Sequence, residues 1–534
     1  MFKNKEKYLN IPNSENYSIL FSKIDLIFIL ILMTIAVFMY IFFHFSIFVS
    51  GDEVRYAVGF KELIFDHNQA FNYEMSFGFY KALSPFIFLL PIKEIAVFLN
   101  TIGSIAGILI LIPLFSLSKS LLNSRIAFFT CLFLIFTPGY WLLSRSGHPS
   151  MLSMLFFLCS MTFFSAALTL DKKGKLGAFF SFAVIFAIAA ILMRADVILW
   201  FMTPFGLAIY HLRRRTNKAF FFTAIFIVIS VCLYLLLKLF FLGHLIPPSG
   251  GTILYHLRNR LPSILMAIKS IGKNLAFFCF SLLPLCFVCL FLSVAHLFRT
   301  KHWRMLALIG LWGGPMLIFL PFMGMDFSRL SVMSLPPALL SISYWIDNRL
   351  KNPNLKILIP FALLITSHVG SIVVGPKIPK LYSFNVNYRN LAISSIPINL
   401  IFADYYLRKE YLETLNSNVH EVINQTERDI FIVVLDSHFP WYQFESFYDR
   451  NVKNLSLISA DNDIGFFSAQ TSQNKIYFYI VKNWRIELHK LIYFLRLEEI
   501  KNAKVHFDQF LLKPPPTKLF FEISEVYKLL KIFN

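Results

Sequence analysis

The sequence predicts an all-helical, multi-pass membrane domain followed by a smaller α/β domain. The 534 residues are 57% hydrophobic and 15% charged, whereas about a quarter of the residues in a soluble domain are charged. Long apolar runs fill most of the first 374 residues, and short basic clusters separate them. The bilayer is therefore expected to be the main solvent of this chain.

The membrane domain is expected to contain about eleven spanning helices, since about 20 apolar residues cross the hydrocarbon core. The first run is too long for a signal peptide and lacks a small-residue cleavage site after it, so we expect it to remain as the first span. The predicted spans are 24–49, 94–116, 126–143, 149–170, 176–193, 196–210, 219–242, 275–298, 305–323, 330–346 and 357–374.

The basic residues between these runs predict the orientation. They fall in alternate connections, as the positive-inside rule requires, if the N-terminus is cytoplasmic. These residues are Lys3, Lys5, Lys7 and Lys23; Lys119 and Arg125; Lys172, Lys173 and Lys175; Arg213, Arg214, Arg215 and Lys218; Arg299, Lys301 and Arg304; and Arg349, Lys351 and Lys356. Segments 50–93 and 243–273 and the tail are then extracytoplasmic. The modest length and the absence of a retrieval signal favour a bacterial inner membrane over the endoplasmic reticulum.

The composition changes after residue 374, which divides the chain into domains 1–374 and 375–534. The charges of the tail are nearly balanced, and it contains no further spanning run. Residues 429–435 (DIFIVVL) and 475–481 read as strands, and 402–424 and 484–503 read as helices. We therefore expect an extracytoplasmic α/β domain.

Several function classes find no support in the sequence. The formal charge of +20 comes from basic clusters between spans and not from a nucleic-acid-binding stripe. Nucleotide-binding glycine motifs and the H-E-x-x-H zinc motif are absent. Cys286 and Cys289 have helical spacing without a second ligand pair, so no metal site is predicted.

The first outer segment, SGDEVRYAVGFKELIF, places Asp52, Glu53 and Arg55 directly after the first span. Acidic residues there could simply stabilise a helix N-terminus, or one could act as a general base facing an outer cavity. An interfacial helix is predicted from Val54 to Phe65. Lys81 follows in FGFYKALSP, ahead of an apolar piece, 82–91, that is too short to cross the membrane.

These features resemble the GT-C superfamily of glycosyltransferases, and most closely the branch with protein O-mannosyltransferases and aminoarabinose transferases. The segments RIAFFTCLFLIFTPGYWLLSRSGHPSMLSMLFFL and FSRLSVMSLPPALL are also similar to spans of that family. The likeness covers most of the membrane domain but not the tail. It departs from the family pattern where Ala82, Leu83 and Ser84 separate Lys81 from Pro85.

The resemblance implies a GT-C-like domain that takes a sugar from a polyprenyl-phosphate donor and transfers it with inversion to an acceptor. Asp52 would be the base, and Glu53 would assist it. Cations would bind the donor's phosphate at the membrane lipid surface, namely Lys81, Arg258, Arg260 and Arg329; ordinary interfacial snorkelling explains Arg258 and Arg260 equally well. The acceptor, a glycan, lipid or protein, stays open, as does a divalent metal cofactor.

Two further outer turns carry ionisable pairs, Arg145 with His148 and Arg194 with Asp196. Each could be a structural clamp or could face a substrate. The alternative function is a transporter or lipid flippase without covalent chemistry, but internal repeats are absent and the ionisable residues gather at one face. Lys238, near the end of a span, is interpreted as snorkelling. A third alternative is an inactive scaffold.

Overall fold

The structure is a computed structural model of the whole chain. It describes residues 21–42, 56, 59–60, 73–87, 90, 92–145, 147–169, 173–211, 216–243, 271–272, 275, 278–279, 282, 284–323 and 331–374, and four strands between 430 and 506. The chain separates into two compact units. The first comprises residues 1–46, 58–90 and 97–369, and the second comprises 47–57, 91–96 and 370–534.

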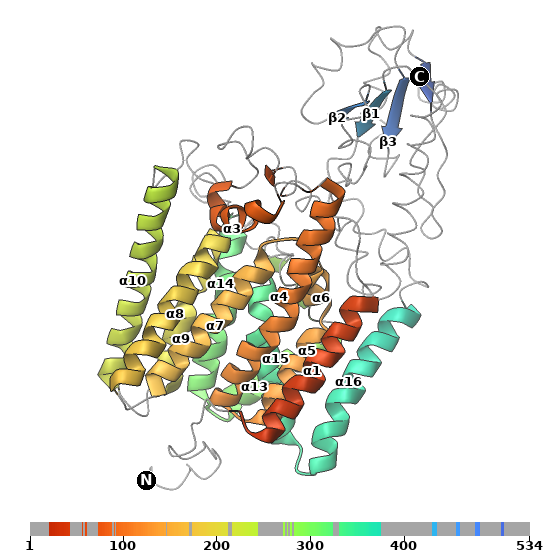
Figure 1. Cartoon of the computed structure of the whole chain (residues 1–534). Helices are drawn as coiled ribbons and strands as arrows, with labels where there is room; N and C mark the ends of the chain where they lie inside the picture. The colour runs from red at the N-terminus through yellow and green to blue at the C-terminus, as the bar shows by residue number, and fades with distance from the viewer. Residues whose placement is uncertain are drawn as a thin grey trace, which may run out of the picture. The chain divides into compact units, whose positions relative to one another are not determined.

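The first unit is a helical bundle (Figure 1). Its helices are α1 (Lys23–Phe42), η3 (Tyr73–Met75), α3 (Phe77–Ile87), α4 (Ile92–Leu121), α5 (Ser124–Ile135), α6 (Pro138–Ser144), α7 (Ser150–Thr169), α8 (Lys173–Met193), η4 (Ala195–Met202), α9 (Thr203–His211), α10 (Thr216–Leu242), α13 (Pro284–Arg299), α14 (Trp303–Met323), η5 (Ser331–Ser334), α15 (Leu335–Arg349) and α16 (Pro353–Val374). Every predicted span overlaps at least one of them.

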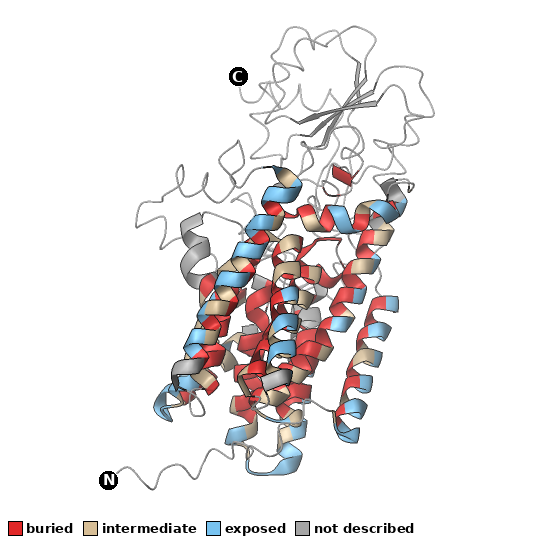
Figure 2. Ribbon diagram, turned by 60° about the vertical axis from the view of Figure 1, so that its left-hand side comes forward, coloured by how far each residue is buried: buried red, intermediate tan, exposed pale blue. Residues whose placement is uncertain are grey.

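Within the described part of the chain, five helices are long and apolar enough to cross a membrane: Lys23–Ile41, Val97–Leu121, Ser150–Thr169, Lys175–Met193 and Ala219–Leu242. Buried residues gather between the helices, and exposed residues lie on the outward surfaces of the peripheral helices (Figure 2). Apolar residues that face outward are expected where lipid is the solvent. The protein is thus a multi-pass membrane protein.

Three predicted spans are not single α-helices, and one of them, 330–346, begins as the 3-10 helix η5 before α15. The run 126–143 is split into α5 and α6, because Pro138 has no N–H to donate to the preceding turn. The run 196–210 is a 3-10 helix, η4, followed by the nine-residue α9. The apolar piece 82–91 overlaps α3, which begins earlier, at Phe77, contains Lys81 and ends at Ile87.

Helix α7 packs antiparallel to α8 through hydroxyl and aromatic contacts. The Ser153 hydroxyl donates to the Ala190 carbonyl at 2.8 Å, and the Ser160 hydroxyl donates to the Ala183 carbonyl at 2.7 Å. Small hydroxyl residues allow close helix approach and bond across the interface where no water is present. The start of α7 therefore lies beside the end of α8.

One end of the bundle, here called the basic end, is held by ion pairs between helix termini. Ser22 and Asp25 form a reciprocal cap at the start of α1, and Lys119 in the last turn of α4 contacts Asp25 at 2.6 Å. Arg125 at the start of α5 and Lys356 at the start of α16 reach Asp347 near the end of α15, at 3.2 and 3.6 Å.

The opposite end, here called the α3 end, holds α3, the start of α7 and the end of α8. Phe60 packs on α3 through its contacts with Phe79 and Tyr80. At Gly78 of α3, an added Cβ would lie 2.7 Å from the backbone oxygen of Leu192, in the last turn of α8. Glycine is needed here for α3 to lie on the end of α8.

The second unit contains a four-stranded parallel sheet of strand order β2-β1-β3-β4. The strands are β1 (Ile430–Val434), β2 (Leu455–Ser459), β3 (Ile476–Ile480) and β4 (Lys504–His506). The strands predicted at 429–435 and 475–481 coincide with β1 and β3, whereas β2 and β4 were not predicted. The predicted helices at 402–424 and 484–503 lie outside the described residues.

Candidate functional site

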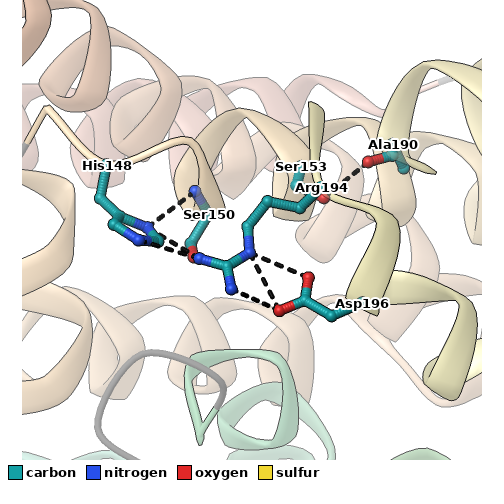
Figure 3. Close-up of polar contacts among 6 residues, drawn as sticks. All are labelled: His148, Ser150, Ser153, Ala190, Arg194 and Asp196. Atoms are coloured by element: carbon teal, nitrogen blue, oxygen red, sulfur yellow. Dashed lines mark hydrogen bonds and ion pairs between the residues drawn. The ribbon is translucent and has the colours of Figure 1, made fainter. Parts of the chain in front are cut away.

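A buried polar cluster at the α3 end joins two turns that are far apart in the sequence. His148 precedes α7 and Ser150 is its first residue, whereas Arg194 follows α8 and Asp196 lies in the first turn of η4 (Figure 3). These four residues are called the Arg194 cluster below. Because α7 and α8 run antiparallel, the residue before one helix meets the residue after the other.

Arg194 directly follows α8, and its side chain makes a forked contact with Asp196. The Arg194 backbone N–H still donates to Ala190 at 3.1 Å, and the Arg194 carbonyl accepts from Val197 as η4 begins. Nε of Arg194 lies 2.9 and 3.0 Å from the two Asp196 carboxylate oxygens, and Nη2 also donates to Oδ2. Such paired bonds hold a guanidinium in one plane and are stronger than neutral hydrogen bonds.

The other edge of the guanidinium faces the first turn. Nη1 of Arg194 lies 2.9 Å from Nε2 of His148 and 3.2 Å from the Ser150 hydroxyl. The Ser150 backbone N–H donates to Nδ1 of His148 at 3.2 Å. Both groups, the guanidinium and the backbone N–H, can only donate, and a neutral imidazole accepts at one ring nitrogen and carries its proton on the other, so it accepts one of these two bonds. A protonated ring could accept neither bond and would place a second cation against Arg194. His148 is therefore neutral in this arrangement.

The environment of His148 favours the same protonation state. The residue is 3% exposed. Burial, and secondarily the charge of Arg194, hold the pKa of His148 well below its ordinary value of 6.5. Both effects disfavour the imidazolium, because a charged ring loses hydration on burial and is repelled by a like charge.

Close backbone contacts place neighbouring helices around the Arg194 cluster. An added Cβ at Gly147 would lie 2.5 Å from Leu99 Cβ, so this turn rests on α4. Leu192, which contacts Gly78 of α3, lies two residues before Arg194. Lys81 follows Gly78 by three residues on α3, and its side chain is exposed. The structure thus brings the helix that carries Lys81 onto the helix end that carries Arg194.

Arg145 directly follows α6 and is fully buried. Residues just before it contact α1 and α4 around Gly107, where an added Cβ would lie 2.6 Å from the Tyr40 hydroxyl and 2.7 Å from Ser144 Cβ. The Tyr140 hydroxyl donates to the Gly107 carbonyl. Arg145 therefore follows a tightly packed junction of α1, α4 and α6.

Of the predicted site residues, His148, Arg194 and Asp196 come together. Arg145 is buried directly after α6, and Lys81 is exposed on α3. The remaining predicted residues lie outside the described ones: Asp52, Glu53, Arg55, Arg258, Arg260 and Arg329. Sequence reasoning did not identify Ser150, which joins the cluster as the first residue of α7. Ser150 could have been identified from the sequence, because it is a serine at a predicted helix start and lies two residues after His148.

The Arg194 cluster can hold two turns together, since most of its polar groups bond one another. A guanidinium that already forks onto a carboxylate has less capacity to fork onto a phosphate. Among the described residues, no group of three or more His, Cys, Asp or Glu side chains could hold a metal ion. The geometry of the cluster is that of a buried support for the α3 end.

The sequence matches no family model and no curated protein. Its structure is similar to the crystal structure of ArnT from Cupriavidus metallidurans bound to undecaprenyl phosphate, with 13% identity and a TM-score of 0.52. The alignment covers 85% of this chain and 93% of that one. The same protein in the apo state aligns at 14% identity with a TM-score of 0.48, over 86% of this chain and 93% of that one. At this identity the first likeness shows that the two chains share a fold, and it shows nothing beyond the fold.

Proposed function

We propose that this protein is a glycosyltransferase that uses a polyprenyl-phosphate sugar as its donor. The observation that carries the proposal is the shared fold, over 85% of this chain, with a protein solved with undecaprenyl phosphate bound. The composition adds support, because a chain largely immersed in lipid can reach a donor that never leaves the bilayer. The sugar and the acceptor class stay open.

The reaction requires one bond to form and one to break. An acceptor hydroxyl or amine attacks the anomeric carbon from the face opposite the lipid phosphate, which inverts the configuration. The bond between that carbon and the phosphate oxygen breaks, and the polyprenyl phosphate leaves with the electron pair. Asp52 takes the proton of the acceptor, and a positioned base contributes about 10²–10⁴-fold to the rate. Glu53 assists Asp52.

The leaving phosphate gains negative charge, so cations at the α3 end stabilise it. Lys81 is the described candidate, exposed on α3. Arg258, Arg260 and Arg329 are the further candidates from the sequence. Fixed cations in a site that excludes water stabilise such developing charge more than they would in bulk solvent.

In this mechanism the Arg194 cluster has a positioning role. It fixes the end of α8, on which α3 lies through the contact between Gly78 and Leu192. If α3 is held in a fixed position on α8, Lys81 is also held in a fixed position. Catalytic groups need to be held within about 0.5 Å of their working geometry. The cluster therefore acts through α3 and not on the substrate itself.

The orientation belongs to the same proposal. The basic end carries Lys119, Arg125 and Lys356, and the positive-inside rule places such residues in the cytoplasm. The α3 end and the 375–534 domain are then extracytoplasmic, on the outer face of a bacterial inner membrane. The donor sugar would be presented at that face.

The proposal is tested by measuring lipid-linked sugars in membranes that express wild type or Asp52→Asn at matched levels. Wild type is expected to consume one polyprenyl-phosphate sugar and release free polyprenyl phosphate, and the variant is expected to lose this conversion by about 10²-fold or more. Asp347→Asn, at the basic end, serves as the matched control that should retain the conversion.

Identical lipid profiles for wild type and untransformed membranes, with defined donors added, would reject the transferase. A change in the sidedness of a lipid without cleavage of its sugar would instead support the transporter or flippase alternative. Conversion by both wild type and Asp52→Asn would keep the transferase and reject Asp52 as its base.

A further inference from the structure

Helix α10 contains one strongly charged side chain in an otherwise apolar span. Between Ala219 and Leu242, Lys238 is the only Asp, Glu, His, Lys or Arg. A charged residue within a span is costly unless its head group reaches water or another polar group. Near a helix end, the usual solution is for the lysine stem to extend along the helix surface with an exposed ammonium.

Lys238 does not follow that pattern, because its side chain is 9% exposed. It continues the buried stripe of α10, whose members recur every three or four residues, as one face of a helix does. The members of the stripe are Ala219, Thr223, Phe226, Ser230, Tyr234 and Lys238. The outward face is apolar and open, with Leu236 at 60% and Phe240 at 81% exposure. Lys238 therefore faces the bundle.

Aromatic contacts place this part of α10 at the α3 end. The Phe77 ring, at the start of α3, lies 6.4 Å from the Tyr234 ring and 6.1 Å from the Phe241 ring, between centroids. Lys238 lies one turn after Tyr234 and just before Phe241, on the same side of α10. It precedes the end of α10 by four residues, or about 6 Å along the axis.

We propose that Lys238 binds the phosphate of a polyprenyl-phosphate lipid at the α3 end, between α10 and α3. This inference rests on the proposed glycosyltransferase function and adds a binding residue to it. A lysine ammonium is a compact charge with three donors, which suits a phosphate that must bind and then leave. A buried ammonium also interacts with an anion more strongly than an exposed one, because water screens it less.

The position of Lys238 complements that of Lys81. Both residues lie at the α3 end, Lys81 exposed on α3 and Lys238 buried on the helix that contacts the start of α3. The aromatic rings of Phe77 and Tyr234 provide apolar surface beside the charge. A lipid phosphate needs this combination, because its headgroup is anionic and its chain begins directly after the phosphate.

The first test measures binding of undecaprenyl phosphate to the purified full-length protein in nanodiscs, for wild type, Lys238→Met and Lys238→Arg. A hydrogen bond to a charged group contributes about 1.5–3 kcal/mol, so Lys238→Met should raise the dissociation constant about 10- to 100-fold. Lys238→Arg retains the charge and should remain within about threefold of wild type. Lys351→Met makes the same chemical change in the exposed turn between α15 and α16 and should bind as wild type does.

The second test needs no substitution. Amine acetylation of wild type, followed by mass spectrometry, reports how accessible Lys238 is. Undecaprenyl phosphate should slow acetylation of Lys238, whereas undecaprenol, which lacks the phosphate, and inorganic phosphate at the same concentration should not. Slower acetylation with inorganic phosphate alone would assign the site to free phosphate and overturn the lipid as its ligand.

The remaining outcomes separate this inference from the function on which it rests. Equal binding by wild type and Lys238→Met overturns the role of Lys238 and leaves the glycosyltransferase proposal standing. No binding by wild type, together with no consumption of any lipid-linked sugar, overturns both. Should Lys238→Met fail to fold, the acetylation result decides alone, and unchanged acetylation of Lys238 with the lipid overturns the inference.

Discussion

Both ends of the helical bundle contain an Arg–Asp pair, and the two pairs differ in their access to water. At the basic end, the Arg125 side chain is 41% exposed and its partner Asp347 is 16% exposed. At the α3 end, Arg194 is 14% exposed and Asp196 is 3% exposed. Two further partners, His148 and Ser150, bond the buried guanidinium, whereas Lys356 is the second cation at Asp347.

This difference in hydration implies different roles. An exposed ion pair gains little, because water screens the charges and the side chains lose freedom, so it ties helix ends together weakly. A buried ion pair is often no more stabilising than apolar residues of similar volume, but removal of one partner leaves an unpaired buried charge. The Arg194 cluster should therefore tolerate change poorly, and the basic end should tolerate it well.

The largest contrast is expected from Asp196→Ala against Asp347→Ala. Loss of Asp196 leaves the guanidinium of Arg194 without its carboxylate and should lower the free energy of unfolding by about 3–5 kcal/mol. Loss of Asp347 should cost about 1 kcal/mol or less. Chemical unfolding in detergent, followed by tryptophan fluorescence, measures both. Similar losses for the two variants would show that hydration does not distinguish the two ends.

The contact between α3 and α8 provides the next contrast. Gly78→Ala forces a Cβ to within 2.8 Å of three Leu192 atoms, two of them backbone, and should destabilise the protein by about 1–3 kcal/mol while displacing Lys81. Gly177→Ala, on α8, is the matched control, because nothing lies within 4 Å of its added Cβ. The Gly177→Ala control should leave the free energy of unfolding unchanged or raise it slightly. Equal unfolding midpoints for the two variants would contradict the close approach.

The pH dependence of stability is the third contrast, since the α3 end holds a buried histidine, His148, in contact with a cation. The pKa of His148 is lowered in the fold, so the unfolded chain binds the proton more readily. The neutral His148 therefore makes its full contribution to the free energy of unfolding above about pH 6.5. As the pH drops from there towards the lowered pKa, the free energy of unfolding falls by up to about 1.4 kcal/mol per pH unit. Unfolding titrations of wild type and His148→Gln between pH 5 and 7.5 should diverge only on the acid side. Parallel curves would count against this assignment.

The smallest effect is expected at the basic end. Lys356→Met removes the longer of the two contacts to Asp347, 3.6 Å, and should cost no more than about 1 kcal/mol at low salt. Because partly exposed charges are screened, this cost should fade as the salt concentration rises towards 1 M. Unfolding midpoints of wild type and variant at two salt concentrations measure the difference. A cost that persists in high salt would mean that this pair is effectively buried.

The sequence by itself determined the class of the protein and the positions of most helices. Apolar length and basic clusters are local properties, and every predicted span overlaps a helix of the structure. Strands β1 and β3 were also recognisable, since their apolar runs are local signals. The breaks within the runs 126–143 and 196–210 were not recognisable from the sequence, because apolar composition does not reveal where a helix changes direction.

Only the tertiary structure decided what the ionisable residues contact. Arg194 meets His148 across 46 positions, and this depends on the antiparallel packing of α7 and α8. From the sequence, Lys238 was interpreted as snorkelling. Composition shows that a lysine lies near a helix end, but it does not show which side of the helix packs on the bundle. Burial is decided by the neighbours of a residue. Here the rings of Tyr234 and Phe241, which flank Lys238 on α10, contact Phe77 of α3, more than 150 positions away.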